Sequence, residues 1–119
     1  MNILKRNKEI IKRHDAGETF LAMSKEYGID AGSMSVTYYA FRNLVDRPCY
    51  DIVAGMDIGD QVAVKLVNVL CRYEGMMQVD LDADYLRTMD RQELIKQRGV
   101  GKAIMDAFDR MQEVFHRNE

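Results

Sequence analysis

The residues best suited to chemistry form a short glycine-bounded run near the carboxy-terminal end, Gly99-Val100-Gly101-Lys102. Glycine at both ends of such a turn predicts a backbone with positive φ, or a close approach by another group. A turn of this kind that opens a helix points free N–H groups outward, beside the positive end of the helix dipole. Lys102 adds a formal positive charge at the same place. The run therefore predicts binding of a phosphate or another anion.

The segments on both sides of this run have helical patterns that would position it. Leu94 and Ile95 give an apolar side to a short helix capped by Asp90, with Glu93 as the reciprocal partner of a capping-box start. The following helix carries an apolar stripe, formed by Ile104, Phe108, Met111 and Phe115.

Two helices joined by this turn resemble a helix-hairpin-helix, a module that in its family grips the DNA backbone without reading bases. The resemblance implies that Gly99, Gly101 and Lys102 contact phosphate. An alternative explanation is that the two glycines only allow the helices to cross closely. The sequence leaves both explanations open.

The composition predicts an all-α protein of one domain or two very small ones. The chain has 119 residues, 47% of them hydrophobic, with one proline, no tryptophan and nine methionines. Methionine fills irregular gaps between helices without needing a fixed shape. Each half of a chain this short would have a thin core if it folded alone.

Catalytic, metal-binding and cofactor-binding patterns are not visible. The chain has no Ser/His/Asp set and no P-loop, so an enzyme is the least expected class. Cys49 and Cys71 show no disulfide pattern, and with His14 and His116 they do not make a metal-ligand cluster. No signal peptide or membrane-spanning apolar run is visible. We expect a reduced, cytoplasmic protein with no cofactor, no metal and no membrane partner.

Positive charge is concentrated toward the amino-terminal end. Residues 1–47 carry 8 basic and 6 acidic side chains, a net charge of +2, whereas residues 48–119 carry 9 basic and 13 acidic side chains, a net charge of −4. A phosphate backbone is therefore more easily met by the first part of the chain.

Three short helices are expected in the first part, over residues 2–16, from 18 or 19 to 27, and over 33–45. Gly17 and Gly28 would end the first two, and Asp30 or Ser33 could cap the third. Pro48 disfavours helical geometry in the residue before it, which indicates a boundary. The expected organisation is a tri-helical unit at 1–46, a linker at 47–58 and a second domain at 59–119.

Residues 15–30 resemble the opening of a helix-turn-helix, as in phage repressors, resolvases and transposase amino-terminal domains. The family has a small residue four positions before the turn glycine, here Ser24 before Gly28, and an apolar residue after it, here Ile29. Ser24 departs from the usual alanine, and the turn at 30–32 has one extra residue. The resemblance implies that the third helix enters the major groove of double-stranded DNA. Its contacts would come from side chains off the core stripe, namely Ser33, Ser35, Thr37 and Arg42.

The second part is expected to contain a buried helix from Asp60 to Tyr73, ended by Glu74-Gly75. A helical turn could form over 50–54, residues 55–59 should be a loop, and residues 76–81 should be irregular. A short helix is expected over 82–89. The aspartates of Asp80 to Asp84 lack the glycine and glutamate of a calcium loop, so they indicate helix capping and solubility.

Residues 57–111 resemble the carboxy-terminal domain of the bacterial RNA polymerase α subunit. The matching segments are 64–70, 86–94 and the turn Val100-Gly101-Lys102. The resemblance implies that Lys65, Asn68, Gly101 and Lys102 meet the DNA minor groove and its phosphates. Lys65 stands where the family has arginine, and Ile104 where it has serine, so the likeness in fold is closer than the likeness in function.

These observations predict a small DNA-binding protein, either a transcriptional regulator or an accessory protein of a phage or mobile element, and a homodimer is compatible with its short recognition helix. The rival hypothesis is a protein-interaction adaptor, for instance one that contacts RNA polymerase without binding DNA. Basic charge on the third helix would favour DNA, and an exposed apolar patch around Val36 and Tyr39 would favour a protein partner.

Overall fold

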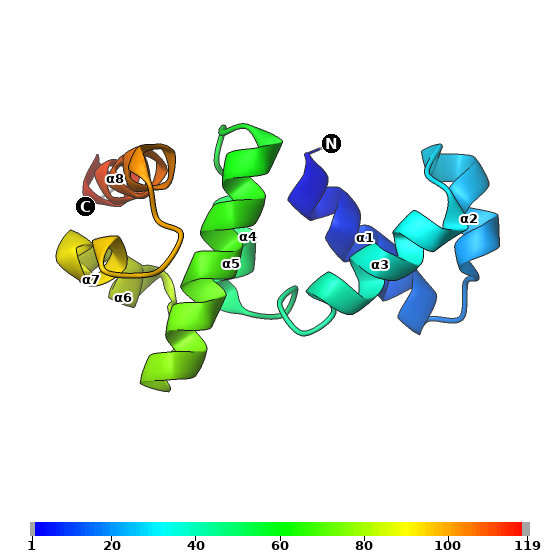
Figure 1. Cartoon of the computed structure of the whole chain (residues 1–119), viewed down its shortest axis with the longest axis horizontal. Coiled ribbons are helices and arrows are strands. Elements are labelled where there is room, and N and C mark those ends of the chain that lie inside the picture. Colours follow the sequence, from blue (N-terminus) through cyan, green and yellow to red (C-terminus); the bar gives the residue numbers. More distant parts are fainter. Residues whose placement is uncertain (1, 118–119) are drawn as a thin grey trace. The chain divides into compact units, whose positions relative to one another are not determined.

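The computed structural model describes residues 2–117, and over these residues it is all-helical (Figure 1). The all-α class expected from the sequence is therefore confirmed. The helices form two compact units, the first ending at Asp46 and the second beginning at Arg47. None of the helices in the described part of the chain is both long enough and apolar enough to cross a membrane.

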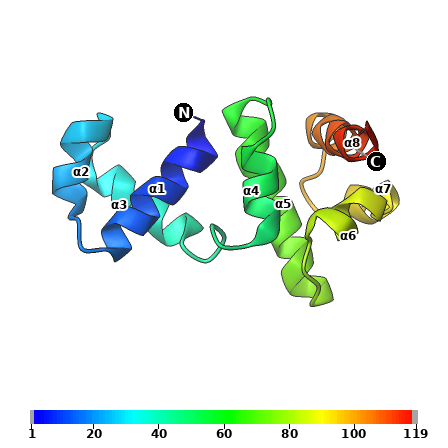
Figure 2. The same ribbon diagram turned by 180° about the vertical axis from the view of Figure 1, so that it is seen from behind.

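The first unit contains α1 (Ile3–Asp15), α2 (Phe20–Tyr27) and α3 (Ala31–Phe41), and α3 packs against both other helices (Figure 2). Asn2, Thr19 and Asp30 cap the three helix starts, each accepting a hydrogen bond from the backbone N–H three residues on. Of the two residues considered for the start of α3, Asp30 is the cap. Gly28 ends α2 with a φ of 70°, in the left-handed region that favours glycine.

One buried apolar cluster of the first unit takes a side chain from each helix. Ile10, Met23 and Met34 are fully buried against one another, and the partly buried side chains of Phe20, Tyr27 and Ile29 pack around them. Helices of 8 to 13 residues are marginal when isolated. The packing of this small apolar centre therefore holds the three helices together.

Arg13 links α1 to α2 at the surface of the first unit. Its guanidinium donates hydrogen bonds of 2.6 and 2.7 Å to the Glu18 carboxylate, and it also donates to Glu26 and Tyr27. The hydrogen bond from Arg13 holds the pKa of Glu18 below its usual value. These exposed pairs position α2 more than they stabilise the unit, because water screens them.

The third helix is shorter than the 33–45 range predicted for it. After Phe41, the N–H of Leu44 bonds to the Phe41 carbonyl oxygen three residues back, which tightens the chain out of α-helical geometry. The resulting turn still buries Val45, so the apolar position was predicted correctly although the helix ends earlier.

The second unit begins with a helix inside the segment expected to be a linker, and the helical turn predicted over 50–54 is confirmed as part of it. α4 (Pro48–Ala54) occupies much of the 47–58 segment, and its residues Cys49, Tyr50 and Val53 are buried. α4 packs against α5 (Asp60–Met77). Pro48 occupies the first turn of α4, where its missing N–H costs nothing, so the proline starts a helix here besides marking a boundary.

The long helix α5 continues past the residues predicted to end it. Gly75 lies inside α5 and is exposed, and the helix ends only at Gln78, which takes a φ of 54°. Glycine in a helix interior lowers stability but does not break the helix, which is why Glu74-Gly75 was a poor stop signal.

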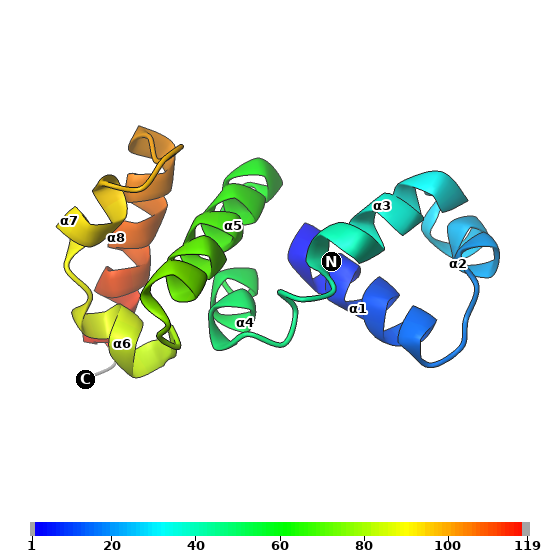
Figure 3. The same ribbon diagram turned by 60° about the horizontal axis from the view of Figure 1, so that its bottom comes forward.

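The remaining helices are α6 (Ala83–Thr88), α7 (Arg91–Ile95) and α8 (Lys102–Arg117), and α8 packs against α5, α6 and α7 (Figure 3). The buried centre of this unit includes Leu66, Leu70, Leu86, Leu94 and Phe108. The apolar stripe predicted for the last helix holds for Ile104, Phe108 and Met111, which are buried, whereas Phe115 is half-buried. This packing holds α8 in place, and the glycine turn leads directly into its first residue, Lys102.

Candidate functional site

The glycine turn joins the end of α7 to the start of α8, at one end of the second unit (Figure 3). Gly99 has a φ of 82°, so the prediction of a left-handed residue is confirmed there. Gly101 does not have a positive φ, and nothing lies within 4 Å of the position that a Cβ would take there. Of the two alternatives predicted for these glycines, positive φ does not hold for Gly101, and a close approach by another group stays a prediction there. Both glycines are exposed.

The start of α8 presents unpaired backbone donors at this turn. The first helical hydrogen bond runs from the Met105 N–H to the Gly101 carbonyl oxygen. The N–H groups of residues 102–104 therefore have no hydrogen-bond acceptor within the helix. Gly101 has no side chain that could cap them. Free N–H groups at the positive end of a 16-residue helix favour an anion.

A groove of about 360 Å³ brings α5 to the turn. It is lined by Gln61, Val62 and Lys65 from α5, and by Gly99, Gly101, Lys102, Ala103 and Ile104 from the turn and α8. Four of the predicted contacts, Lys65, Gly99, Gly101 and Lys102, therefore share one surface although 34 residues separate the first from the second. Lysine side chains beside free N–H groups make this groove suited to a phosphate oxygen.

Asn68 does not line this groove. Its amide nitrogen donates a 2.9 Å hydrogen bond to the Val64 carbonyl oxygen of the same helix, and the residue is exposed. The side chain can reach an outside partner only after it gives up this bond. Asn68 is therefore a weaker candidate than Lys65.

Arg72 is a cation at this site that the sequence analysis missed. Its Nη2 donates a hydrogen bond to the Arg98 carbonyl oxygen, which ties α5 to the residue before Gly99. The signal was available, because Arg72 follows Lys65 by seven positions and so lies on the same face of the helix. Arg72, two helical turns beyond Lys65 on α5, thus helps to position the glycine turn.

The acidic residues of the second unit are partly engaged in helix capping. Asp82 caps α6 and Asp90 caps α7, each accepting a 2.9 Å hydrogen bond from a backbone N–H. The predicted capping role is confirmed for both. The Asp90 carboxylate accepts from the Gln92 N–H, not from the Glu93 N–H that a capping box would use. The Glu93 carboxylate lies 4.0 Å from Lys96 Nζ, so it pairs with this lysine and not with the start of the helix.

One carboxylate competes with an anion at the turn. Lys102 Nζ lies 2.8 Å from Asp106 Oδ2, one turn along α8, and the hydrogen bond raises the pKa of Lys102. The Lys102 side chain is 89% exposed, so this pair is weak and an incoming phosphate can replace it. Asp106 nevertheless lowers the local positive potential.

No family model, no curated protein and no solved structure matches this chain. The three family resemblances, to a helix-hairpin-helix, a helix-turn-helix and the RNA polymerase α carboxy-terminal domain, therefore rest on the quoted residues alone.

The predicted contacts on α3 are less available than those at the glycine turn. The Ser33 hydroxyl is engaged with the helix cap, because it donates a 2.7 Å hydrogen bond to Asp30 Oδ2. Ser35 and Thr37 are half-buried. Arg42 is exposed, and its guanidinium lies 5.1 Å from the centre of the Tyr39 ring. Of the four, Arg42 alone presents an exposed charge.

The outward face of α3 is largely apolar. Val36 is 71% exposed and Tyr39 63% exposed, and Leu21 on α2 is 65% exposed. An exposed apolar patch around Val36 and Tyr39 was predicted to favour a protein partner, and both side chains are exposed. The side chains of Tyr39 and Arg42 together also offer a flat ring and a cation.

Proposed function

We propose that the protein binds double-stranded DNA through its sugar–phosphate backbone, as a small regulator of transcription or an accessory protein of a phage or mobile element. The observation that supports this proposal is the grouping of Lys65 and Lys102 with the open start of α8 in one groove. A phosphate there would meet two ammonium groups and backbone N–H donors together.

The expected affinity of the second unit alone is modest. Residues 48–119 carry a net charge of −4, and binding to DNA is driven largely by phosphate neutralisation. Asp106, which pairs with Lys102, reduces the positive potential at the groove. A contact from the first unit, whose amino-terminal helix is basic, would supply the remaining affinity.

The first unit would place α3 at the DNA with little sequence discrimination. Arg42 is the one predicted contact on α3 able to make a paired hydrogen bond to guanine, and Ser33 is occupied by Asp30. Contacts to phosphate orient a protein without reading sequence. We therefore expect similar affinity for duplexes of different sequence.

Binding of a fluorescent random-sequence duplex at low salt tests this proposal, with anisotropy as the readout. Lys102→Glu should weaken binding at least tenfold. Arg117→Glu is the matched control, since Arg117 lies near the far end of the same helix and pairs with Glu113 four residues back. The proposal is wrong if wild-type protein does not bind, or if both variants weaken binding equally.

The adaptor hypothesis has one observation in its favour, the exposure of Val36, Tyr39 and Leu21. Val36 and Tyr39 are three residues apart and so lie on the same side of α3, and exposed apolar side chains on one helix face mark many protein-binding surfaces. In this case the double substitution Val36→Ser/Tyr39→Ser should abolish binding to purified bacterial RNA polymerase and leave duplex affinity unchanged. A loss of self-association in sedimentation experiments with the same variant would instead assign the patch to a homodimer.

A further inference from the structure

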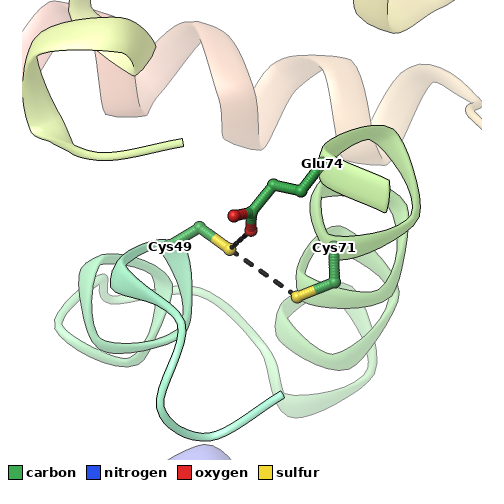
Figure 4. Close-up of side chains that lie close together, drawn as sticks. All are labelled: Cys49, Cys71 and Glu74. Atoms are coloured by element: carbon green, nitrogen blue, oxygen red, sulfur yellow. Dashed lines mark hydrogen bonds between the residues drawn. The ribbon is translucent and has the colours of Figure 1, made fainter. Parts of the chain in front are cut away.

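Two cysteines that show no pattern in the sequence lie side by side inside the second unit (Figure 4). Cys49 is in the first turn of α4 and Cys71 is in the second half of α5. Their sulfur atoms are 3.6 Å apart, and both residues are buried. The packing of α4 on α5 thus places two soft metal ligands together, which a spacing of 22 residues does not reveal.

Glu74 completes the group from the next turn of α5. Its Oε1 accepts a 2.9 Å hydrogen bond from the Cys49 thiol, and its Oε2 accepts a 3.4 Å hydrogen bond from the Leu81 N–H. The residue is only 5% exposed. A carboxylate at this depth with neutral donors is costly, and a bound cation would offset that cost.

We propose that Cys49, Cys71 and Glu74 form a binding site for a divalent transition-metal ion, with Zn²⁺ as the best match. One ligand atom from each residue lies within 4.8 Å of the other two. With Zn–S near 2.3 Å and Zn–O near 2.1 Å, a tetrahedral centre would separate its two sulfurs by about 3.8 Å and each sulfur from the oxygen by about 3.6 Å. The present separations of 3.6 and 2.9 Å need only small side-chain shifts to match them.

The ligand chemistry selects the class of metal. Two thiolates with one carboxylate suit zinc, and the sulfurs disfavour magnesium and calcium, which take oxygen ligands. On binding, Zn²⁺ displaces the protons of both thiols, so that two protons leave for each ion bound. The fourth tetrahedral position would be taken by water, since the protein supplies three ligands.

Neighbouring groups already orient this site. The Leu81 N–H holds the second Glu74 oxygen, which leaves the first oxygen turned toward Cys49. Arg47 Nη1 donates a 3.2 Å hydrogen bond to the Cys71 carbonyl oxygen and places a positive charge near the site. Two thiolates, one carboxylate and Zn²⁺ sum to −1, and the guanidinium balances that charge. The bound ion would tie α4 to α5, independently of DNA binding.

Titration of the reduced full-length chain with Co²⁺ tests the proposal. We expect one equivalent to bind, with thiolate-to-cobalt charge-transfer absorption and the visible bands of a tetrahedral centre, and Zn²⁺ should displace it. Zn²⁺ should also raise the melting temperature of the wild-type chain. Cys71→Ser should remove most of the charge-transfer absorption, and Glu74→Gln should weaken cobalt binding at least tenfold.

Asp84→Asn is the control for adventitious carboxylate binding, because this side chain is 91% exposed and is near Glu74 in the chain. It should bind cobalt as the wild type does. The wild-type spectrum decides the question even if a ligand variant fails to fold. Absence of thiolate-to-cobalt absorption in the wild type, or air oxidation to a Cys49–Cys71 disulfide with no zinc affinity in the reduced chain, would overturn the proposal.

Discussion

The Arg72 guanidinium donates a hydrogen bond to the carbonyl oxygen of Arg98, and so α5 holds the chain one residue before the left-handed Gly99. The same helix brings Lys65 to the groove at this turn. The helix that supplies a cation thus also restrains the turn that presents the backbone donors. Pre-organised donors bind an anion with less loss of conformational freedom.

Replacement of Arg72 should loosen the turn without unfolding the unit. We expect Arg72→Met to speed amide hydrogen exchange over residues 97–101, because the side-chain anchor is lost while its apolar stem remains. Arg110→Met is the matched control, since Arg110 donates to the Asp57 carbonyl oxygen elsewhere in the unit. Equal exchange rates at the turn in both variants would contradict this role for Arg72.

Replacement of Gly75 and of Gly99 by alanine should change the stability of the second unit in opposite directions. Gly75→Ala should stabilise the protein by about 0.5–1 kcal/mol, because Gly75 is an exposed helical residue with open space around it. Gly99→Ala should destabilise it by about 1 kcal/mol, since a φ of 82° strains any side chain. Urea unfolding followed by circular dichroism measures both changes, and the same sign for both would be inconsistent with the structure.

Gly101→Ala separates the fold from the function. The fold has room for the added methyl group, and the backbone φ is not in the left-handed region, so stability should change little. The methyl group would stand in the groove beside Lys65 and Lys102, where a phosphate must approach the backbone closely. We expect a several-fold loss of duplex affinity at unchanged melting temperature. Unchanged affinity would show that DNA does not approach this turn closely.

Removal of a carboxylate beside the turn should strengthen DNA binding. Asp106 pairs with Lys102 and repels phosphate, so Asp106→Asn should raise duplex affinity several-fold at low salt. Glu113→Gln removes the same charge from the pair with Arg117 near the other end of α8 and should have a smaller effect. Anisotropy titrations compare the two. A larger gain from Glu113→Gln would move the contact surface to the other end of the helix.

The Asp30 cap should make the first unit sensitive to acid. Backbone hydrogen bonding from Ser33, followed by the Ser33 hydroxyl, holds the pKa of Asp30 below its usual value of 3.8. Because the folded pKa is the lower one, the ionised cap stabilises the fold above pH 3.8, and this contribution is lost as the pH falls through the folded pKa. Asp30→Asn keeps an acceptor without the charge. Its melting temperature should therefore fall less than that of the wild type on acidification, and an equal fall would argue against the cap.

Local signals in the sequence were sufficient for most helices and for the bend at the turn. Thr19 and Asp30 lie at helix starts, and Gly28 and Gly99 take positive φ, because caps and left-handed residues act within one turn of the chain. Long-range packing was not predictable in the same way. Only a helical turn was predicted within the 47–58 segment. The packing of α4 against α5, which buries Cys49, Tyr50 and Val53, makes that segment part of the second unit.

In the candidate sites too, the features set by local sequence were predicted, and those set by helix packing were not. The turn itself was visible from its glycines, and Lys65 was named through a family resemblance. The Arg72–Arg98 contact and the meeting of Cys49 with Cys71 depend on how helices pack across 22 to 26 residues of chain. Ser35 and Thr37 were named as contacts through the helix-turn-helix resemblance and their position off the core stripe. They are half-buried in the structure, where α3 packs against both α1 and α2.

The salt dependence of duplex binding tests the central claim most directly. Each lysine that neutralises a phosphate contributes about 0.9 to the slope of log K against log salt concentration. Lys65→Gln/Lys102→Gln should therefore reduce the wild-type slope by roughly 2, whereas Arg117→Gln, which removes a charge about 22 Å along α8 from Lys102, should leave it unchanged. A slope that is the same in the wild type and the double variant would contradict phosphate binding at the Gly99–Lys102 turn.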